Sequence, residues 1–250
     1  MEMNSTVEKD VERFPVISLL GITGSGKSTL GARLAEDYNL YHLSVDDLLR
    51  DQCRTPMPEE SEDINELAAQ GEPIPEDLVP LYPSRELNIY MYLQRGQVVP
   101  PYLAFPVLAR RIEVVARTSP CRGILLDGFP RELGHIMKAR QFLPVHFMLA
   151  IHIACPIEVA EARYLQRARG NDDIAKFNMQ AAHYKEHMRL VLKHFESWNQ
   201  LVTVVVDGGM DADASYALLV TMLGEDPNWH RLVDDEVAFA TWMSSATVIL

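Results

Sequence analysis

The chain has few cysteines and no long apolar run. Its 250 residues include three cysteines, Cys53, Cys121 and Cys155, and no two of them form a CxxC pair. Zinc sites and disulfide frameworks need more closely spaced cysteines, so the sequence predicts neither and fits a reduced, intracellular setting, cytoplasmic or nuclear. No apolar run reaches the length of a membrane span. Residues 1–13 are polar and acidic, unlike a presequence, and we treat them as a leader outside the core.

An excess of basic charge is also missing, because the formal net charge is −12. Residues 51–86 hold ten acidic side chains against two arginines, and residues 225–250 hold five against one, so the remaining chain is balanced. Duplex nucleic acid requires a basic face. We therefore expect no nucleic-acid partner and no membrane partner, whereas a small nucleotide could still bind local arginines. The sequence indicates no particular protein partner.

What the chain does have is a phosphate-loop pattern. Residues 16–20 fit a buried strand, residues 29–38 fit a helix, and the pattern Gly-x4-Gly-Lys-Ser lies between them. Such a loop points backbone N–H groups and a helix N-terminus at a polyphosphate, its lysine reaches the β- and γ-phosphates, and its serine binds Mg²⁺. A simple glycine-rich turn would not account for the flanking strand and helix. The expected donor-binding residues are Gly21, Gly24, Ser25, Gly26, Lys27, Ser28 and Thr29.

A second strand with a carboxylate at its end is predicted over residues 123–126. It leads into Asp127-Gly-Phe-Pro-Arg131. In phosphate-loop enzymes a carboxylate at the C-terminal end of a parallel strand holds Mg²⁺ through water. The alternative is a plain Asp-Gly turn. Downstream of a phosphate loop the metal interpretation is favoured, with Ser28 and Asp127 as the expected metal residues.

Strand and helix patterns alternate along the rest of the chain. Further strands are expected at 40–44, 144–155 and 201–206, and helices at 45–51, 103–116, 157–170, 173–197 and 214–223. This alternation predicts a five-stranded parallel sheet with helices on both faces, which is an α/β fold. Residues 54–86, with six prolines and most of the acidic charge, are expected to form an exposed, irregular insertion. Residues 224–250 form a C-terminal extension.

Four landmarks occur in the order found in one enzyme family. They are the loop at 21–28, the segment at 42–50, the Gly-Gln-Val-Val-Pro step at 96–100, and the Asp-Gly-Phe-Pro-Arg segment at 127–131. Over about residues 15–223 the chain resembles the nucleoside monophosphate kinases, which include adenylate kinase and UMP-CMP kinase. The resemblance implies a three-layer P-loop kinase fold over 14–223, with an enlarged acceptor-binding segment at 45–100 and a short lid at 163–173.

The resemblance also implies the substrates and the roles of the site residues. ATP and Mg²⁺ would bind at the phosphate loop, with Arg163 over the donor adenine, while Arg50 and Arg131 grip the acceptor phosphate. The implied catalytic residues are Lys27, Arg131, Arg167 and Arg169. The implied acceptor-binding residues are Val45, Arg50, Val99, Arg131 and His135.

The sequence departs from the family pattern on the acceptor side. Val45 and Asp46 stand where Thr or Ala and then Gly are usual, and His135 replaces an amide that reads the acceptor base. We therefore expect an acceptor that is not strictly AMP, and a selectivity that changes below about pH 6.5 as His135 gains a proton. Alternatively Gln97 reads the base. In the lid, Arg169 is displaced by one residue from the arginine position of the family pattern. The family pattern also has a later arginine, and its position falls near Gln180, where this chain has no arginine.

Three functions follow from these observations. The first is a phosphotransferase that moves the ATP γ-phosphoryl group to a nucleoside monophosphate, giving ADP and a nucleoside diphosphate. The second is an ATP-binding regulatory protein of the same fold with weakened catalysis. The third is a P-loop kinase for another small acceptor.

Overall fold

The architecture is that of a central parallel sheet covered by helices on both faces. The computed structural model describes residues 14–53, 85–143, 145–167 and 173–234. Five strands lie in the order β2-β3-β1-β4-β5, and every neighbouring pair is parallel. The strands are β1 (Phe14–Gly21), β2 (Tyr41–Ser44), β3 (Ile124–Asp127), β4 (Val145–Ala154) and β5 (Leu201–Val205). The predicted α/β fold with a five-stranded parallel sheet is confirmed.

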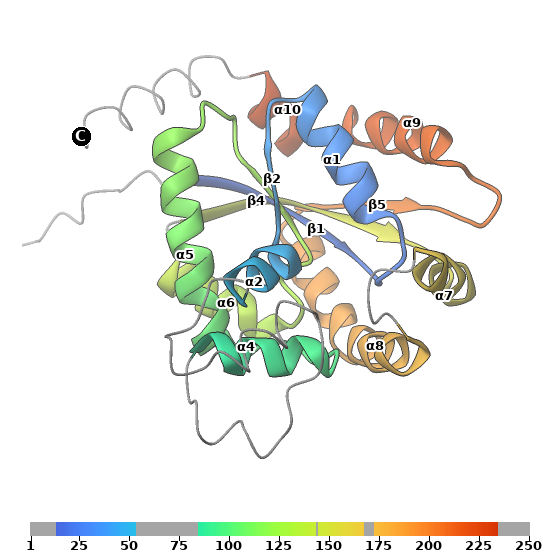
Figure 1. Ribbon diagram of the computed structural model, residues 1–250. Helices are drawn as coiled ribbons and strands as arrows, with labels where there is room; N and C mark the ends of the chain where they lie inside the picture. Colours follow the sequence, from blue (N-terminus) through green and yellow to red (C-terminus); the bar gives the residue numbers. More distant parts are fainter. Residues whose placement is uncertain (1–13, 54–84, 144, 168–172, 235–250) are drawn as a thin grey trace, which may run out of the picture.

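Two helical layers enclose the sheet (Figure 1). On one face lie α1 (Lys27–Asp37), α9 (Ala212–Leu223) and α10 (Pro227–Val233). On the other lie α2 (Val45–Cys53), α4 (Arg85–Gln94), α5 (Pro101–Thr118), α6 (Leu133–Phe142) and α8 (Ile174–Ser197). Helix α7 (Ile157–Gln166) packs against α8. Among the helices of these described ranges, none is both long and apolar enough to cross a bilayer.

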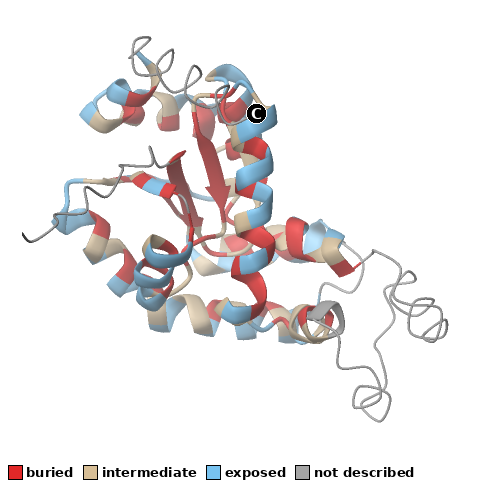
Figure 2. Cartoon of the chain, turned by 90° about the vertical axis from the view of Figure 1, so that its left-hand side faces the viewer, coloured by how far each residue is buried: buried red, intermediate tan, exposed pale blue. Residues whose placement is uncertain are grey.

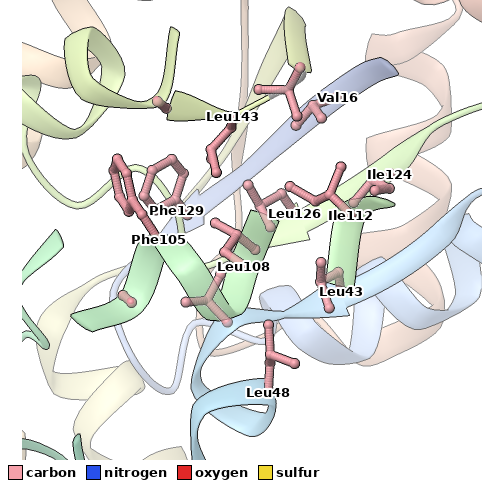
Figure 3. Close-up of a cluster of buried hydrophobic side chains, with 14 of the residues drawn as sticks. Val16, Leu43, Leu48, Phe105, Leu108, Ile112, Ile124, Leu126, Phe129 and Leu143 are labelled. Carbon is pink, nitrogen blue, oxygen red and sulfur yellow. The ribbon is translucent and has the colours of Figure 1, made fainter. Parts of the chain in front are cut away.

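Strand β1 shows why the sheet needs both layers. Val16 and Leu20 point into the core cluster on the α5 side, whereas Ile17 and Leu19 point into the cluster on the α1 side. All four side chains are 0–1% exposed, so the strand is apolar on both faces, as expected for a parallel sheet. Figure 2 shows the buried strands at the centre, and Figure 3 shows Phe105, Leu108 and Ile112 packed beside β1 and β3.

The helix boundaries differ from the predicted ones in places. Helix α6 was not predicted; its N-cap residue Glu132 makes no side-chain capping bond, so the usual start signal is missing. Helix α7 ends at Gln166 rather than at 170. By contrast α8 begins after Asp173, whose carboxylate accepts a hydrogen bond from the Lys176 N–H at 2.8 Å. The leader 1–13, most of the acidic insertion at 54–84, and residues 168–172 and 235–250 lie outside the described residues.

Helix α10 lies within the segment that the sequence set apart as an extension. Its Trp229 is 2% exposed and meets the Tyr38 ring edge-on, with ring centroids 4.8 Å apart. Leu232 of the same helix is also buried in the α1-side cluster. Residues 227–233 therefore form part of the packed body.

Replacing Trp229 by alanine should cost about 3 to 5 kcal/mol of unfolding free energy, because a buried indole is lost and a cavity remains. The matched control is Trp198→Ala, since Trp198 is 60% exposed and should change the unfolding free energy by only about 0.5 kcal/mol. Urea unfolding of both variants measures the difference. Equal effects would show that α10 does not contribute to the core.

Candidate functional site

The loop between β1 and α1 adopts the conformation that its glycines permit. Gly24 and Gly26 have φ angles of 83° and 90°, values that residues with a Cβ rarely adopt. A Cβ on Gly24 would lie 2.0 Å from the Ala160 carbonyl oxygen, so α7 packs directly against the loop. The loop closes with a hydrogen bond from the Ser25 N–H to the Ile22 carbonyl at 3.1 Å. The first turn of α1 thus begins at the carboxyl end of the sheet, where an anion would bind.

Lys27 lies over this loop and faces several other charges. Its Nζ donates to the Ile22 carbonyl at 3.4 Å. Burial lowers the pKa of Lys27, the carboxylates of Asp127 and Asp46 partly offset that effect, and the nearby charge of Arg131 lowers the pKa further. A desolvated ammonium group of this kind would be stabilised by a bound polyphosphate.

Asp127 ends β3 beside the loop, as the sequence predicted. In the sheet register it lies opposite Leu19 of β1 and Ser44 of β2. Ser28 Oγ donates to Asp127 Oδ2 at 2.5 Å, and His42 Nε2 lies 3.4 Å from the same oxygen. Burial raises the pKa of Asp127, but His42, Lys27 and Ser28 together outweigh it and the net pKa is lowered.

One carboxylate oxygen of Asp127 is available to bind a metal ion or a water molecule. The buried Oδ1 has no hydrogen-bond partner among the residues that the structure describes. Buried polar atoms are normally paired, so this oxygen is a natural ligand position. Together with the Ser28 hydroxyl it offers the hard oxygen donors that Mg²⁺ prefers.

Asp46, which the sequence did not assign to the site, holds Arg131. Arg131 Nη2 lies 2.6 Å from Asp46 Oδ1, and its Nε donates to the Gly128 carbonyl at 3.0 Å. Burial alone would raise the pKa of Asp46, but the charges of Arg131 and Arg50 lower it below its ordinary value. The guanidinium expected to grip an acceptor phosphate is therefore already paired with a carboxylate.

Lys27, Asp46 and Arg131 line one pocket at the carboxyl end of the sheet. Its walls are the loop with Lys27, the Asp46 side chain, the segment around Arg131, and one face of α8. The sequence did not assign this face of α8 to the site, although it marked Gln180 as the place of a missing arginine. The α8 residues that line the pocket are Gln180, His183, Tyr184 and Met188.

The remaining predicted arginines that the structure describes do not line the pocket, and each has another partner. Arg50 pairs with Asp47 at 2.8 Å on the exposed side of α2. Arg163 donates to the carbonyls of Asp207 and Met210 at 3.2 and 3.3 Å. Arg167 lies over the Tyr164 ring at 4.4 Å, close enough for its charge to lower the pKa of Lys27. Arg169 is outside the described residues.

The predicted base-contact residues are buried. Val45, Val99 and His135 are 6%, 5% and 4% exposed, and none of the three lines the pocket. The His135 ring stacks on Phe129 with centroids 5.3 Å apart, and its Nδ1 accepts from the Arg131 N–H at 3.4 Å. This packing favours support of the Arg131 backbone over direct contact with a base.

The expected titration of His135 near pH 6.5 is wrong. Burial, together with the charge of Arg131, lowers its pKa to about 4 even though Glu132 acts in the opposite direction. The imidazole therefore stays neutral throughout the range in which a free histidine changes charge.

Comparison with known proteins agrees with this geometry. A family model described as an AAA domain matches residues 20–78. The chain is 27% identical over 205 residues to adenylate kinase isoenzyme 5 of Bos taurus, covering 80% of this chain but only 31% of that protein. It is 25% identical to the uridylate kinase of Saccharomyces cerevisiae, covering 80% of this chain and 87% of that enzyme. It is also 25% identical to the UMP-CMP kinase of Gallus gallus, covering 78% and 91%. The resemblance inferred from the order of the motifs is confirmed.

We expect the free energy of unfolding to fall as the pH is lowered from about 6.5 towards 4. His135 and His152 are buried, and burial lowers the pKa of each to about 4, whereas in the unfolded chain their pKa is about 6.5. The unfolded chain therefore takes up protons in this window that the folded chain does not, and the stability is fully present only above it. Urea unfolding at several pH values measures the slope. His152→Gln should reduce the slope, and a flat wild-type profile between pH 7 and 5 would contradict the assignment.

Proposed function

We propose that this chain, whose fold, loop and curated relatives support the nucleoside monophosphate kinase family, transfers the γ-phosphoryl group of ATP to a nucleoside monophosphate. An oxygen of the acceptor phosphate forms a bond to the γ-phosphorus, and the bond from that phosphorus to the β–γ bridging oxygen breaks. The products are ADP and a nucleoside diphosphate. The observation that carries the proposal is a pocket lined by both Lys27 of the phosphate loop and Arg131.

The donor side of the pocket supports ATP binding. The loop N–H groups and Lys27 would hold the β- and γ-phosphates, because they are fixed and partly shielded from water before the ligand arrives. Ser28 and Asp127 would hold Mg²⁺, Asp127 through water, and the unpaired Asp127 Oδ1 fits that role. The ion would neutralise charge on the phosphate oxygens.

The cellular compartment is proposed from the cysteines. All three are free thiols, namely Cys53, Cys121 and Cys155, which is compatible with a reducing compartment. We therefore place the reaction in the cytoplasm or nucleus.

The acceptor side supports a phosphate-bearing acceptor. Arg131 points into the pocket that contains Lys27, and a guanidinium can bind two phosphate oxygens at once. An acceptor phosphate must displace Asp46 from Arg131 before it binds in this way. Arg50 is within electrostatic reach of Asp46, so it would help to hold that carboxylate once Arg131 has turned to the acceptor.

The Asp46–Arg131 pair also favours a second candidate, an ATP-binding regulatory protein with slow transfer. A carboxylate 2.6 Å from the acceptor arginine competes with the substrate, and neutral Gln180 lies in the pocket where the resemblance implies another arginine. Both features reduce the positive charge available to the transferring group. The two candidates catalyse the same phosphoryl transfer and differ in its rate. A kinase for another small acceptor is the third outcome of the assays below.

We expect Lys27→Ala to slow ATP-dependent transfer by about 30- to 1,000-fold while the chain stays folded. Loss of one charge-assisted phosphate contact in a shielded site should cost about 2 to 4 kcal/mol in the transition state. Coupled assays of ADP formation with AMP, GMP, CMP, UMP and their deoxy forms give the rates and the preferred acceptor. Wild-type turnover in the variant would exclude this donor site. Consumption of ATP only with other hydroxyl or phosphate acceptors would favour the third candidate.

Asp46→Asn should lower the acceptor KM about tenfold, because Arg131 no longer has to leave a carboxylate. The affinity for ATP measured without acceptor should change little. Asp51→Asn, which removes an exposed carboxylate on the same helix, is the control and should leave both values unchanged. A higher acceptor KM in Asp46→Asn would mean that Asp46 assists acceptor binding.

A further inference from the structure

A cluster of metal-ligating side chains lies beside the pocket and is separate from the proposed Mg²⁺ residues. His183 and His187 are one helical turn apart on α8, so they share a face, and Glu132 is the N-cap residue of α6. One ligand atom from each of the three residues lies within 4.8 Å of those of the other two. Their side chains are neither fully buried nor fully exposed, so an ion could reach them from solvent.

The chemistry of this cluster suits a zinc-class ion. Two imidazoles and one carboxylate favour Zn²⁺ and similar transition metals, whereas Mg²⁺ prefers oxygen ligands alone. At zinc–ligand distances of about 2.1 Å, tetrahedral ligand atoms are about 3.4 Å apart. Because the present atoms lie within 4.8 Å of one another, side-chain rotations that bring them up to about 1.4 Å closer would give that spacing. Three protein ligands leave a fourth position for water.

The two histidines are neighbours on α8, as expected for residues four apart on a helix. Their ring centroids are 4.3 Å apart. Burial and the His187 charge lower the pKa of His183, so this residue is neutral at physiological pH. Neutral imidazole is the form that binds a metal.

We propose that Glu132, His183 and His187 form a binding site for Zn²⁺ that joins the start of α6 to α8. His135 Nε2 lies 3.3 Å from Glu132 Oε1, so an imidazole stands beside the proposed carboxylate ligand. Glu132 directly follows Arg131, and His183 lines the pocket. The bound ion therefore links two walls of the pocket that must admit the acceptor.

A purely local chelate on α8 is the competing explanation. Glu186 Oε2 is 3.7 Å from His187 Nε2, and its side chain is 74% exposed. If Glu186 supplied the carboxylate in place of Glu132, the ion would bind to one helix and would not join α6 to α8. The two glutamates therefore distinguish the two arrangements.

The test is zinc binding by the tag-free, metal-stripped full chain, measured by isothermal titration in excess Mg²⁺ and without nucleotide. We expect one Zn²⁺ per chain, and at least tenfold weaker binding in Glu132→Gln and in His187→Ala. Two control variants should bind Zn²⁺ as the wild type does. Glu186→Gln changes the exposed carboxylate beside His187, and His146→Ala changes an exposed histidine on β4. Circular dichroism and thermal unfolding check that each variant is folded.

Cobalt substitution provides a second measurement. The wild-type chain with Co²⁺ should show the visible absorption of a four- or five-coordinate site, and Glu132→Gln should change that spectrum while Glu186→Gln leaves it unchanged. No stoichiometric Zn²⁺ binding by the wild type would overturn the proposal. Loss of binding in Glu186→Gln with retention in Glu132→Gln would overturn it equally, because the ion would then sit on α8 alone. Either result is independent of kinase activity.

Discussion

Four partly desolvated charges at the carboxyl end of the sheet hold the site together. Lys27 lies near Asp127 and Asp46, and Asp46 is paired with Arg131 at 2.6 Å. Removing one partner from such a set leaves an uncompensated charge away from water, which costs more than the pair itself contributes. The cluster therefore constrains the surrounding chain in the absence of ligand, and it already places two cations where phosphate groups would bind.

The sheet topology explains how residues so far apart in the sequence meet here. Strand β1 lies at the centre between β3 and β4, so the chain leaves it at a point where the strand order changes direction, the usual place for a ligand in an open α/β sheet. The loop after β1, Asp127 at the end of β3, and Asp46 just after β2 all come to this edge. Helix α8 closes the pocket from the other layer.

The parts that could be predicted from the sequence are those with a local signature. Three features can be recognised from neighbouring residues alone. They are the glycine spacing around Lys27, the apolar strand that ends at Asp127, and the Asp173 N-cap of α8. The Asp46–Arg131 pair spans 85 residues, and no local pattern indicates it. Helix α6 lacks a capping signal, and Trp229 packs against residues far away in the sequence, including Tyr38. His135 was misjudged because its pKa depends on burial, which a single sequence does not reveal.

The central claim is that one pocket brings a donor phosphate and an acceptor phosphate together. The most direct measurement follows the label from γ-³²P-ATP incubated with the chain, Mg²⁺ and a nucleoside monophosphate. The account predicts that the label appears on the nucleoside diphosphate in a one-to-one ratio with ADP. Label found only in inorganic phosphate, or ATP that stays intact with every acceptor, would contradict it.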